Sequence, residues 1–211
     1  MRAAAVIAAA GRSSRMGEFK PLMVLDGETV IGRIVRALRD AGAEEIVAAV
    51  GYRGGELERH LTPLGVGVVQ NRRFGETQML DSLKLGIAAL TGPWDVLFLL
   101  PGDVPLIRAG TLRAMMEQPG QAVRPVWNGR GGHPLMVRPE GLSGLLDYRG
   151  PDGLRGAVSA RGLTVTDFPV EDRGCTLDAD TREDWEEIRA VLHCGEKQRT
   201  APQRPGAVRE G

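Results

Sequence analysis

The chain has 211 residues, enough for one large domain with its own core. Its 27 basic residues balance its 27 acidic ones, so no net field draws it to nucleic acid or to an anionic membrane, and any phosphate-binding charge must be local. Two cysteines, Cys175 and Cys194, do not suggest a disulfide framework, and the apolar start stops at Gly11, too early for a signal peptide. Without a later run that could span a membrane, we expect a cytoplasmic protein that binds neither nucleic acid nor membrane.

The first half of the chain alternates apolar runs, which predict strands, with apolar residues at helical spacing, which predict helices. The predicted strands are 2–9, 44–51, 66–71 and 94–103, and the predicted helices are 29–41, 55–61 and 77–90. Gly42 follows the first helix, where glycine commonly ends one. The unbroken apolar run 96–100 is typical of a strand covered on both faces. We therefore expect a doubly wound, Rossmann-like α/β fold in which a mainly parallel sheet lies between two helical layers.

The second half is less regular but continues as mixed α and β structure. We expect helices at 110–117, 139–147 and 152–160, strands at 122–127, 133–137 and 163–168, and a last helix at 181–193. Thr181 is placed to cap that helix, with Asp184 in its first turn. From residue 195 the chain is polar and lacks a period. The prediction is a single domain over 1–194 followed by a disordered tail over 195–211.

A cationic glycine loop, AAAGRSSRMGEFK (8–20), follows the first predicted strand. Ligands of open parallel sheets bind beyond the carboxyl ends of the strands, where this loop would lie. It matches neither the Walker loop nor the dinucleotide fingerprint. Gly11 would nevertheless let the backbone approach an anion, and Arg15 and Lys20 would supply charge. Its residues leave two interpretations open, a phosphate-binding loop and an ordinary surface loop with solvated cations.

A single acid follows the most apolar strand. In PGDVP, Asp103 stands between Pro101 and Pro105, which stiffen the backbone around it. It could cap a turn, but Mg²⁺ in proteins is usually held by one or two carboxylates together with substrate phosphates. A cationic glycine loop after one strand and a rigid acid after another predict a site for a nucleotide with Mg²⁺.

Two further segments carry polar groups. In TLDADTRED, Asp178 and Asp180 alternate, so both would point to one side of an extended segment, and helix capping is the favoured interpretation for Asp180. In GRGGHPLMV, His133 follows a glycine turn, and a structural role is the default for a lone histidine. The histidines and cysteines match no zinc pattern.

Four motifs together resemble the MobA-like nucleotidyltransferases that attach a nucleotide to the molybdenum cofactor. They are the loop AAAGRSSRMGEFKPLM, the strand end LPGDVPLI, the segment GRGGHPLMV and the closing motif LDADTREDW. The resemblance runs in order over residues 2–192, and the AAG and GHP variants are closer to the cytidylyltransferase branch. The segment GETQMLDSLKLGI stands where that branch has Gly-Met and a run of serines, and Arg182 stands where proline is usual.

This resemblance implies the three-layer fold of the nucleotide-diphospho-sugar transferase type and a set of site residues. Arg15, Lys20 and Asp103 would be catalytic, and Asp103 and Asp178 would bind Mg²⁺. The nucleotide would contact Ala9, Ala10, Gly11, Arg15, Lys20, Asn71, Ser82 and Asp103. His133 would lie near the acceptor.

The implied reaction transfers a nucleotide, with CTP favoured among the NTPs, to the terminal phosphate of molybdopterin or molybdenum cofactor and releases pyrophosphate. Maturation factors of molybdoenzymes would be further partners. Two alternatives remain at this stage. One is a nucleotidyltransferase that acts on a sugar 1-phosphate or alcohol phosphate, and the other is a non-catalytic nucleotide- or cofactor-binding accessory protein.

Overall fold

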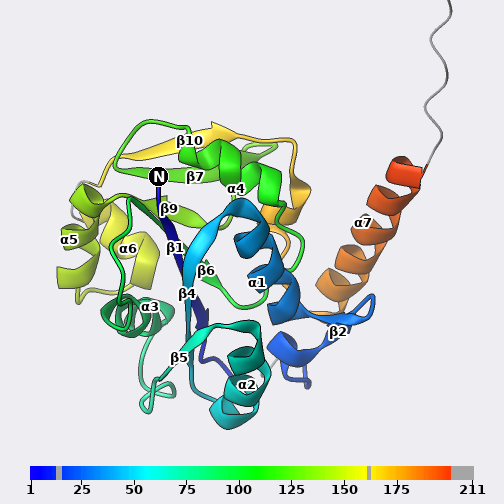
Figure 1. Cartoon of the computed structure of the whole chain (residues 1–211), viewed down its shortest axis with the longest axis horizontal. Helices are drawn as coiled ribbons and strands as arrows, with labels where there is room; N and C mark the ends of the chain where they lie inside the picture. Colours follow the sequence, from blue (N-terminus) through cyan, green and yellow to red (C-terminus); the bar gives the residue numbers. More distant parts are fainter. Residues whose placement is uncertain (13–15, 161–162, 201–211) are drawn as a thin grey trace, which may run out of the picture.

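A computed structural model describes residues 1–12, 16–160 and 163–200 (Figure 1). Its main sheet has the strand order β10-β7-β9-β6-β1-β4-β5, with β8 beside β7. The bounds are β1 Ala3–Ala9, β4 Ala43–Val50, β5 Gly67–Gln70, β6 Val96–Pro101, β7 Ala122–Trp127, β8 Arg130–Gly131, β9 Leu135–Val137 and β10 Val165–Pro169. The pairs β1–β4, β1–β6, β4–β5 and β10–β7 are parallel, whereas β9 runs antiparallel to both β6 and β7. The expected mainly parallel sheet is confirmed.

Helices cover both faces of this sheet (Figure 1). They are α1 Val30–Ala41, α2 Gly54–Leu61, α3 Met79–Ala88, α4 Ala109–Met116, α5 Pro139–Asp147, α6 Gly153–Ala160 and α7 Arg182–Thr200. Alternate residues of β1 face opposite ways. Ile7 therefore belongs to an apolar cluster with residues of α1, α2 and α4, and Val6 to a second cluster with residues of α3, α5 and α6. Both side chains are fully buried. The predicted three-layer α/β/α arrangement is therefore confirmed.

The helix ends follow the local chemistry of the sequence. Gly42 ends α1 in the left-handed conformation, with φ 101°, and its N–H donates to Leu38 and Arg39 carbonyls. Thr181 precedes α7, where its hydroxyl accepts from the Asp184 N–H and its own N–H donates to the Asp184 carboxylate. Both helix boundaries agree with the sequence-based prediction.

Two features of the chain differ from the predictions. A small hairpin of β2 (Val24–Leu25) and β3 (Glu28–Thr29) precedes α1, and its two-residue strands are too short to give a period in the sequence. Helix α7 runs to Thr200, beyond residue 193 where the predicted last helix ended. Glu, Lys, Gln and Arg over 196–199 are good helix formers, and the first residue that cannot continue a helix is Pro202.

Helix α7 extends from the body of the molecule, and its first half covers the hairpin (Figure 1). Ile188 and Leu192 pack there with Leu25, Leu177 and Ala179 in a separate small core. In the described part of the chain, no helix combines the length and the apolar character that a membrane span needs.

Candidate nucleotide site

A cavity of about 240 Å³ opens at the carboxyl ends of the neighbouring strands β1 and β6. Its walls come from four parts of the chain and consist of Ala8, Ala9, Ala10, Gly11, Lys20, Pro21, Phe74, Thr77, Gln78, Met79, Ser82, Pro101, Gly102 and Asp103. The two strand ends are in close contact, since the Gly102 N–H donates to the Ala8 carbonyl at 2.9 Å. A Cβ at Gly102 would lie 3.0 Å from the Ala9 Cβ, so glycine in the PGD motif permits this approach. Two motifs from distant parts of the sequence thus form one site.

Lys20 is the central cation of this cavity in the described structure. It lies in the short 3-10 helix η1 (Lys20–Leu22) and is only 7% exposed. Its Nζ donates to Asp103 Oδ2 at 3.3 Å and also to the carboxylate of Asp180. Because two carboxylates meet one ammonium, substrate phosphates entering here would meet a cation already fixed in position.

Asp103 has an unusual environment for a carboxylate. Its Oδ1 is buried without a hydrogen-bond partner among the described residues, and only Oδ2 contacts Lys20. Burial raises the pKa of Asp103, an effect that Lys20 opposes and that the nearby charges of Asp178 and Asp180 strengthen. An orphaned carboxylate oxygen beside further acids is a suitable ligand for a hard cation. The donor set therefore fits Mg²⁺.

The acids do not form a complete metal cage by themselves. Across the described residues, no three His, Cys, Asp or Glu side chains are grouped as a metal site. Mg²⁺ in nucleotide sites commonly needs only one or two carboxylates because phosphates and water complete its coordination. The arrangement is consistent with a cation that arrives with a nucleotide.

The structure separates the roles of the two acids in the closing motif. Helix α7 is capped by Thr181 rather than by Asp180, so the expected capping role of Asp180 is wrong. The Asp180 carboxylate instead contacts Lys20. Asp178 lies 3.8 Å from the Arg130 guanidinium, and its charge acts on both Asp103 and His133. The segment is held against the site because the Ala179 N–H donates to the Asp103 carbonyl at 3.0 Å.

Asn71 and Ser82 lie together at the base of the cavity. Both are 3% exposed, and the Asn71 amide donates to the Ser82 hydroxyl at 3.0 Å. Ser82 lines the cavity, whereas Asn71 reaches it only through Ser82 and Thr77. The sequence prediction placed both residues at the nucleotide, and in the structure both lie at the same side of the cavity.

Aromatic rings connect the start of the glycine loop to the segment after β5. The Arg12 guanidinium lies 5.5 Å from the centre of the Phe74 ring, and Tyr52 lies between Phe74 and Phe19 with centroid distances of 6.4 and 5.8 Å. The Tyr52 N–H also donates to the Ala10 carbonyl at 3.1 Å. Sequence reasoning missed this cluster, because isolated aromatic residues give no periodic signal.

His133 lies in a second cavity of about 540 Å³ that adjoins the first. Gln78 and Met79 line both cavities. Arg124 and Arg155 line the second one together with Asp152, and Arg124 is paired with Asp167 at 2.7 Å. Burial lowers the pKa of His133, while the nearby Asp178 charge opposes this shift. Its imidazole is therefore neutral near pH 7 and can accept or donate a hydrogen bond without adding charge.

Most of the predicted nucleotide-contacting residues meet in the first cavity. Ala9, Ala10, Gly11, Lys20, Ser82 and Asp103 all line it. Arg15 lies outside the described residues, and so do the two serines before it. Residues that the motifs did not single out are Thr77, Gln78 and Met79, although all three lie in the predicted helix 77–90 that holds Ser82.

Comparison with known proteins decides the family. The model of the MobA-like NTP transferase domain matches residues 5–165, which include the glycine loop, Asp103 and His133. The chain belongs to the MobA-like NTP transferase family. It is thus an enzyme of the nucleotidyltransferase type, as the four motifs predicted.

The individual relatives carry different names. The molybdenum cofactor cytidylyltransferase of Escherichia coli (strain K12) is 27% identical over 183 residues, covering 85% of this chain and 92% of the relative. The bifunctional protein GlmU of Geobacter sulfurreducens is 31% identical and matches 92% of this chain, but only 37% of its own length. Among solved structures, a nucleotidyl transferase from Methanothermobacter thermautotroptrophicus superposes with a TM-score of 0.78 at 27% identity, covering 92% of this chain and 99% of the other.

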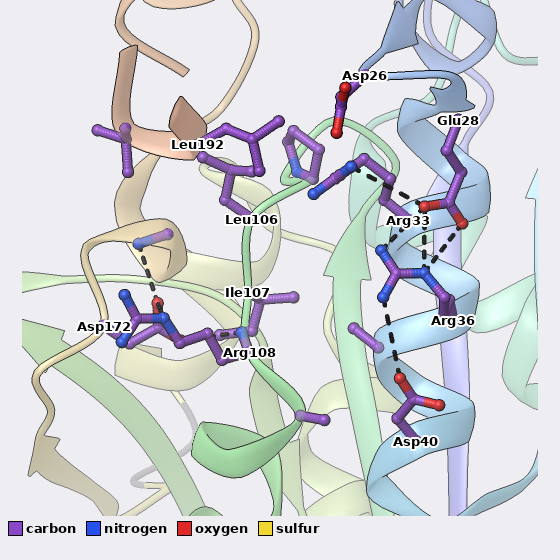
Figure 2. Close-up of a pocket in the computed structure, with 15 residues that line it drawn as sticks. Asp26, Glu28, Arg33, Arg36, Asp40, Leu106, Ile107, Arg108, Asp172 and Leu192 are labelled. Atoms are coloured by element: carbon purple, nitrogen blue, oxygen red, sulfur yellow. Dashed lines mark hydrogen bonds and ion pairs between the residues drawn. The ribbon is translucent and has the colours of Figure 1, made fainter. Parts of the chain in front are cut away.

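This MobA-like transferase also has a larger cavity, of about 800 Å³, between α1, the 105–109 segment and α7 (Figure 2). Its charges are paired: Arg36 contacts Glu28 at 2.9 Å and Asp40 at 4.0 Å, and Arg108 lies 3.7 Å from Asp172. Four acids face three arginines on these walls, so the cavity offers a polyanion no excess of positive charge. The smaller cavity at the strand ends is the better candidate for the nucleotide.

Proposed function

We propose that this enzyme transfers CMP from CTP to the terminal phosphate of molybdopterin or molybdenum cofactor, releases pyrophosphate and depends on Mg²⁺. The observation that carries the proposal is the contact of Lys20 with Asp103 in one cavity, with Asp180 on the same ammonium, beside a second cavity lined by Arg124 and Arg155. The cytidylyltransferase relative, matched along nearly its whole length, supports the choice of CTP and of acceptor.

Two adjoining cavities suit a reaction between two phosphate compounds. The nucleotide would occupy the cavity at the strand ends, with its phosphates against Lys20 and the backbone at Gly11. The acceptor would occupy the cavity with His133, Arg124 and Arg155, so that its phosphate meets the nucleotide beside Gln78. The positive charges of Lys20 in the first cavity and Arg155 in the second would lower the repulsion between the two polyanions.

The chain's own groups act mainly by positioning and by charge. A phosphate oxygen of the acceptor attacks the α-phosphorus of the nucleotide, and the bond to the bridging oxygen of the leaving pyrophosphate breaks. A phosphate monoester is already anionic, so no strong general base is needed. Lys20 would donate hydrogen bonds to oxygens that gain charge in the transition state. Arg15 is proposed to act with it, from a segment outside the described residues.

Mg²⁺ would be held by Asp103 and by one acid of the closing motif. When bound, it would supply charge neutralisation between the phosphates. Asp178 is the ligand that the motif resemblance favours, whereas the contact of Asp180 with the same ammonium as Asp103 favours Asp180. Both carboxylates are close enough to influence the pKa of Asp103.

The deciding experiment is an assay of pyrophosphate release with CTP, GTP and ATP, each with and without molybdopterin. We expect release only when CTP, molybdopterin and Mg²⁺ are all present. Release with a sugar 1-phosphate in place of molybdopterin would favour the second candidate, which the match to one part of GlmU supports. Nucleotide binding without release under any condition would favour a non-catalytic accessory role.

Three remaining expectations belong to the same proposal. Residues 1–194 would form the single nucleotidyltransferase domain, and 195–211 would be a tail outside it. The enzyme would work in the cytoplasm, in agreement with a free, buried Cys175. Molybdoenzyme maturation factors would receive its product.

A further inference from the structure

Asn71 lies behind the nucleotide cavity in a chain of hydrogen bonds. The donor and the acceptor of each bond in this chain can be assigned. The side chain is buried, and its amide makes three hydrogen bonds. Its Oδ1 accepts from the Arg73 N–H at 3.0 Å, and its Nδ2 donates to Thr77 Oγ1 at 2.9 Å and to Ser82 Oγ at 3.0 Å. These bonds use both amide hydrogens, so Asn71 has no donor left for a ligand.

The donor and acceptor of each bond follow from the backbone groups in the chain, because each of these can only donate or only accept. A backbone N–H can only donate, so the amide atom facing the Arg73 N–H must be the oxygen, and the nitrogen must face Thr77 and Ser82. The Thr77 hydroxyl in turn donates to the Arg73 carbonyl at 3.0 Å, and a carbonyl can only accept. Thr77 thus donates its proton within the protein and accepts from Asn71.

Ser82 is the end of the chain that faces the cavity. Its hydroxyl oxygen accepts from Asn71, so its single proton remains to be donated, and no protein acceptor for it is found among the described residues. We propose that Asn71 is a positioning residue that holds the Ser82 hydroxyl as a hydrogen-bond donor toward the nucleotide. This inference rests on the proposed function, because it takes the cavity to bind an NTP.

The ligand atom opposite Ser82 must then be a hydrogen-bond acceptor. In CTP, the carbonyl oxygen and ring nitrogen of the base and the oxygens of the ribose meet this requirement. An aspartate at position 71 would still accept from Arg73, but it would present an acceptor to Ser82. The Ser82 proton would then turn back to residue 71, and the donor would be withdrawn from the ligand.

The test measures the dissociation constant of CTP by calorimetry for the wild type, Ser82→Ala, Asn71→Asp and the double variant. Loss of one hydrogen bond corresponds to about tenfold weaker binding. We expect each single variant to bind CTP about tenfold more weakly than the wild type. The double variant should bind no more than about twofold more weakly than either single variant. Asn71→Ala serves if Asn71→Asp does not fold, because it frees the hydroxyl to turn, and we expect it to weaken binding by about threefold.

The matched control is Thr111→Val, which removes a buried hydroxyl that donates to Asp172 at 2.6 Å, away from the cavity. It should lower the melting temperature but leave the CTP dissociation constant unchanged.

Ribose 5-triphosphate distinguishes the two sources of the acceptor. If Ser82 contacts the base, the effect of Ser82→Ala vanishes with this ligand, and if Ser82 contacts the ribose, the effect is preserved. Wild-type affinity in folded Asn71→Asp, alongside weak binding by Ser82→Ala, would overturn the inference. Absence of NTP binding by the wild type would instead overturn the proposed function.

Discussion

The Lys20 ammonium lies 3.3 Å from Asp103 Oδ2 and also contacts the carboxylate of Asp180, which is 160 residues away in the chain. One cation thus joins the glycine loop, the end of β6 and the segment before α7. In the ligand-free protein, this ammonium offsets part of the repulsion between the two carboxylates. A cation that arrives with the nucleotide would take over this role.

Replacement of Lys20 by methionine should therefore affect both stability and activity. Loss of one partner from a buried ion pair costs about 3–5 kcal/mol, and loss of a transition-state donor lowers kcat by about 10²–10³-fold. We expect Lys20→Met to have a clearly lower melting temperature and at least about a hundredfold lower pyrophosphate release. Added Mg²⁺ should raise the melting temperature of this variant more than that of the wild type, because the cation then has no ammonium to displace.

Arg36→Met is the matched control, since Arg36 also contacts a carboxylate but its side chain is 54% exposed. Its loss should change the melting temperature little, because exposed pairs contribute about 0–1 kcal/mol. Equal destabilisation by both variants would contradict the special role of the Lys20 pair.

Asp103→Asn should separate stability from function. Burial and two neighbouring acids raise the pKa of Asp103, which means that its charged form is unfavourable in the folded protein. The neutral amide removes that cost, so we expect a melting temperature at least equal to that of the wild type. Pyrophosphate release should fall by at least about a hundredfold. Near-normal Mg²⁺-dependent activity of Asp103→Asn would contradict the assignment of the metal site.

Asp178→Asn and Asp180→Asn can identify the second carboxylate. Asp180 shares Lys20 with Asp103, whereas Asp178 lies near Arg130. We therefore expect Asp180→Asn to raise the Mg²⁺ concentration for half-maximal activity by about tenfold, and Asp178→Asn to raise it less. A Mg²⁺ titration of pyrophosphate release measures both values. The reverse order would assign the second ligand to Asp178.

The sequence was sufficient to predict the layered fold and most of the residues that meet in the site. Apolar runs and helix caps are local signals, so β6, the end of α1 and the start of α7 could be located from neighbouring residues alone. The rule that ligands bind beyond the carboxyl ends of parallel strands then brought Gly11 and Asp103 together.

The remaining details depend on contacts between distant segments. A period of two puts Asp178 and Asp180 on one side of an extended segment, but only the position of Lys20 shows which of them contacts it. The role of Asn71 could not be read from its position after β5, because it depends on the directions of bonds to Arg73 and Ser82. The short β2–β3 hairpin left no pattern at all.

Cys175, which packs behind the Gly-Gly-His turn, provides a test of stability against pH. It is fully buried, its carbonyl accepts from the His133 N–H at 2.7 Å, and a Cβ at Gly132 would lie 2.4 Å from that carbonyl oxygen. Burial raises the pKa of its thiol from 9.0 to about 12. The folded protein therefore keeps the thiol proton at a pH where the unfolded chain has lost it, so stability is complete below pH 9 and falls as pH rises toward 12.

The expected loss from this thiol at pH 10 is about 1 kcal/mol of unfolding free energy. Denaturant unfolding at pH 8 and pH 10, in a Cys194→Ala background that leaves one thiol, measures it. Additional replacement of Cys175 by alanine should remove this part of the pH dependence, although the smaller side chain lowers stability at both pH values. The folded single-thiol protein should also react slowly with a thiol reagent at pH 8, because the reactive thiolate is scarce and shielded. Rapid reaction without unfolding, or an unchanged pH slope in the alanine variant, would show that Cys175 is not held as a buried, protonated thiol behind the His133 turn.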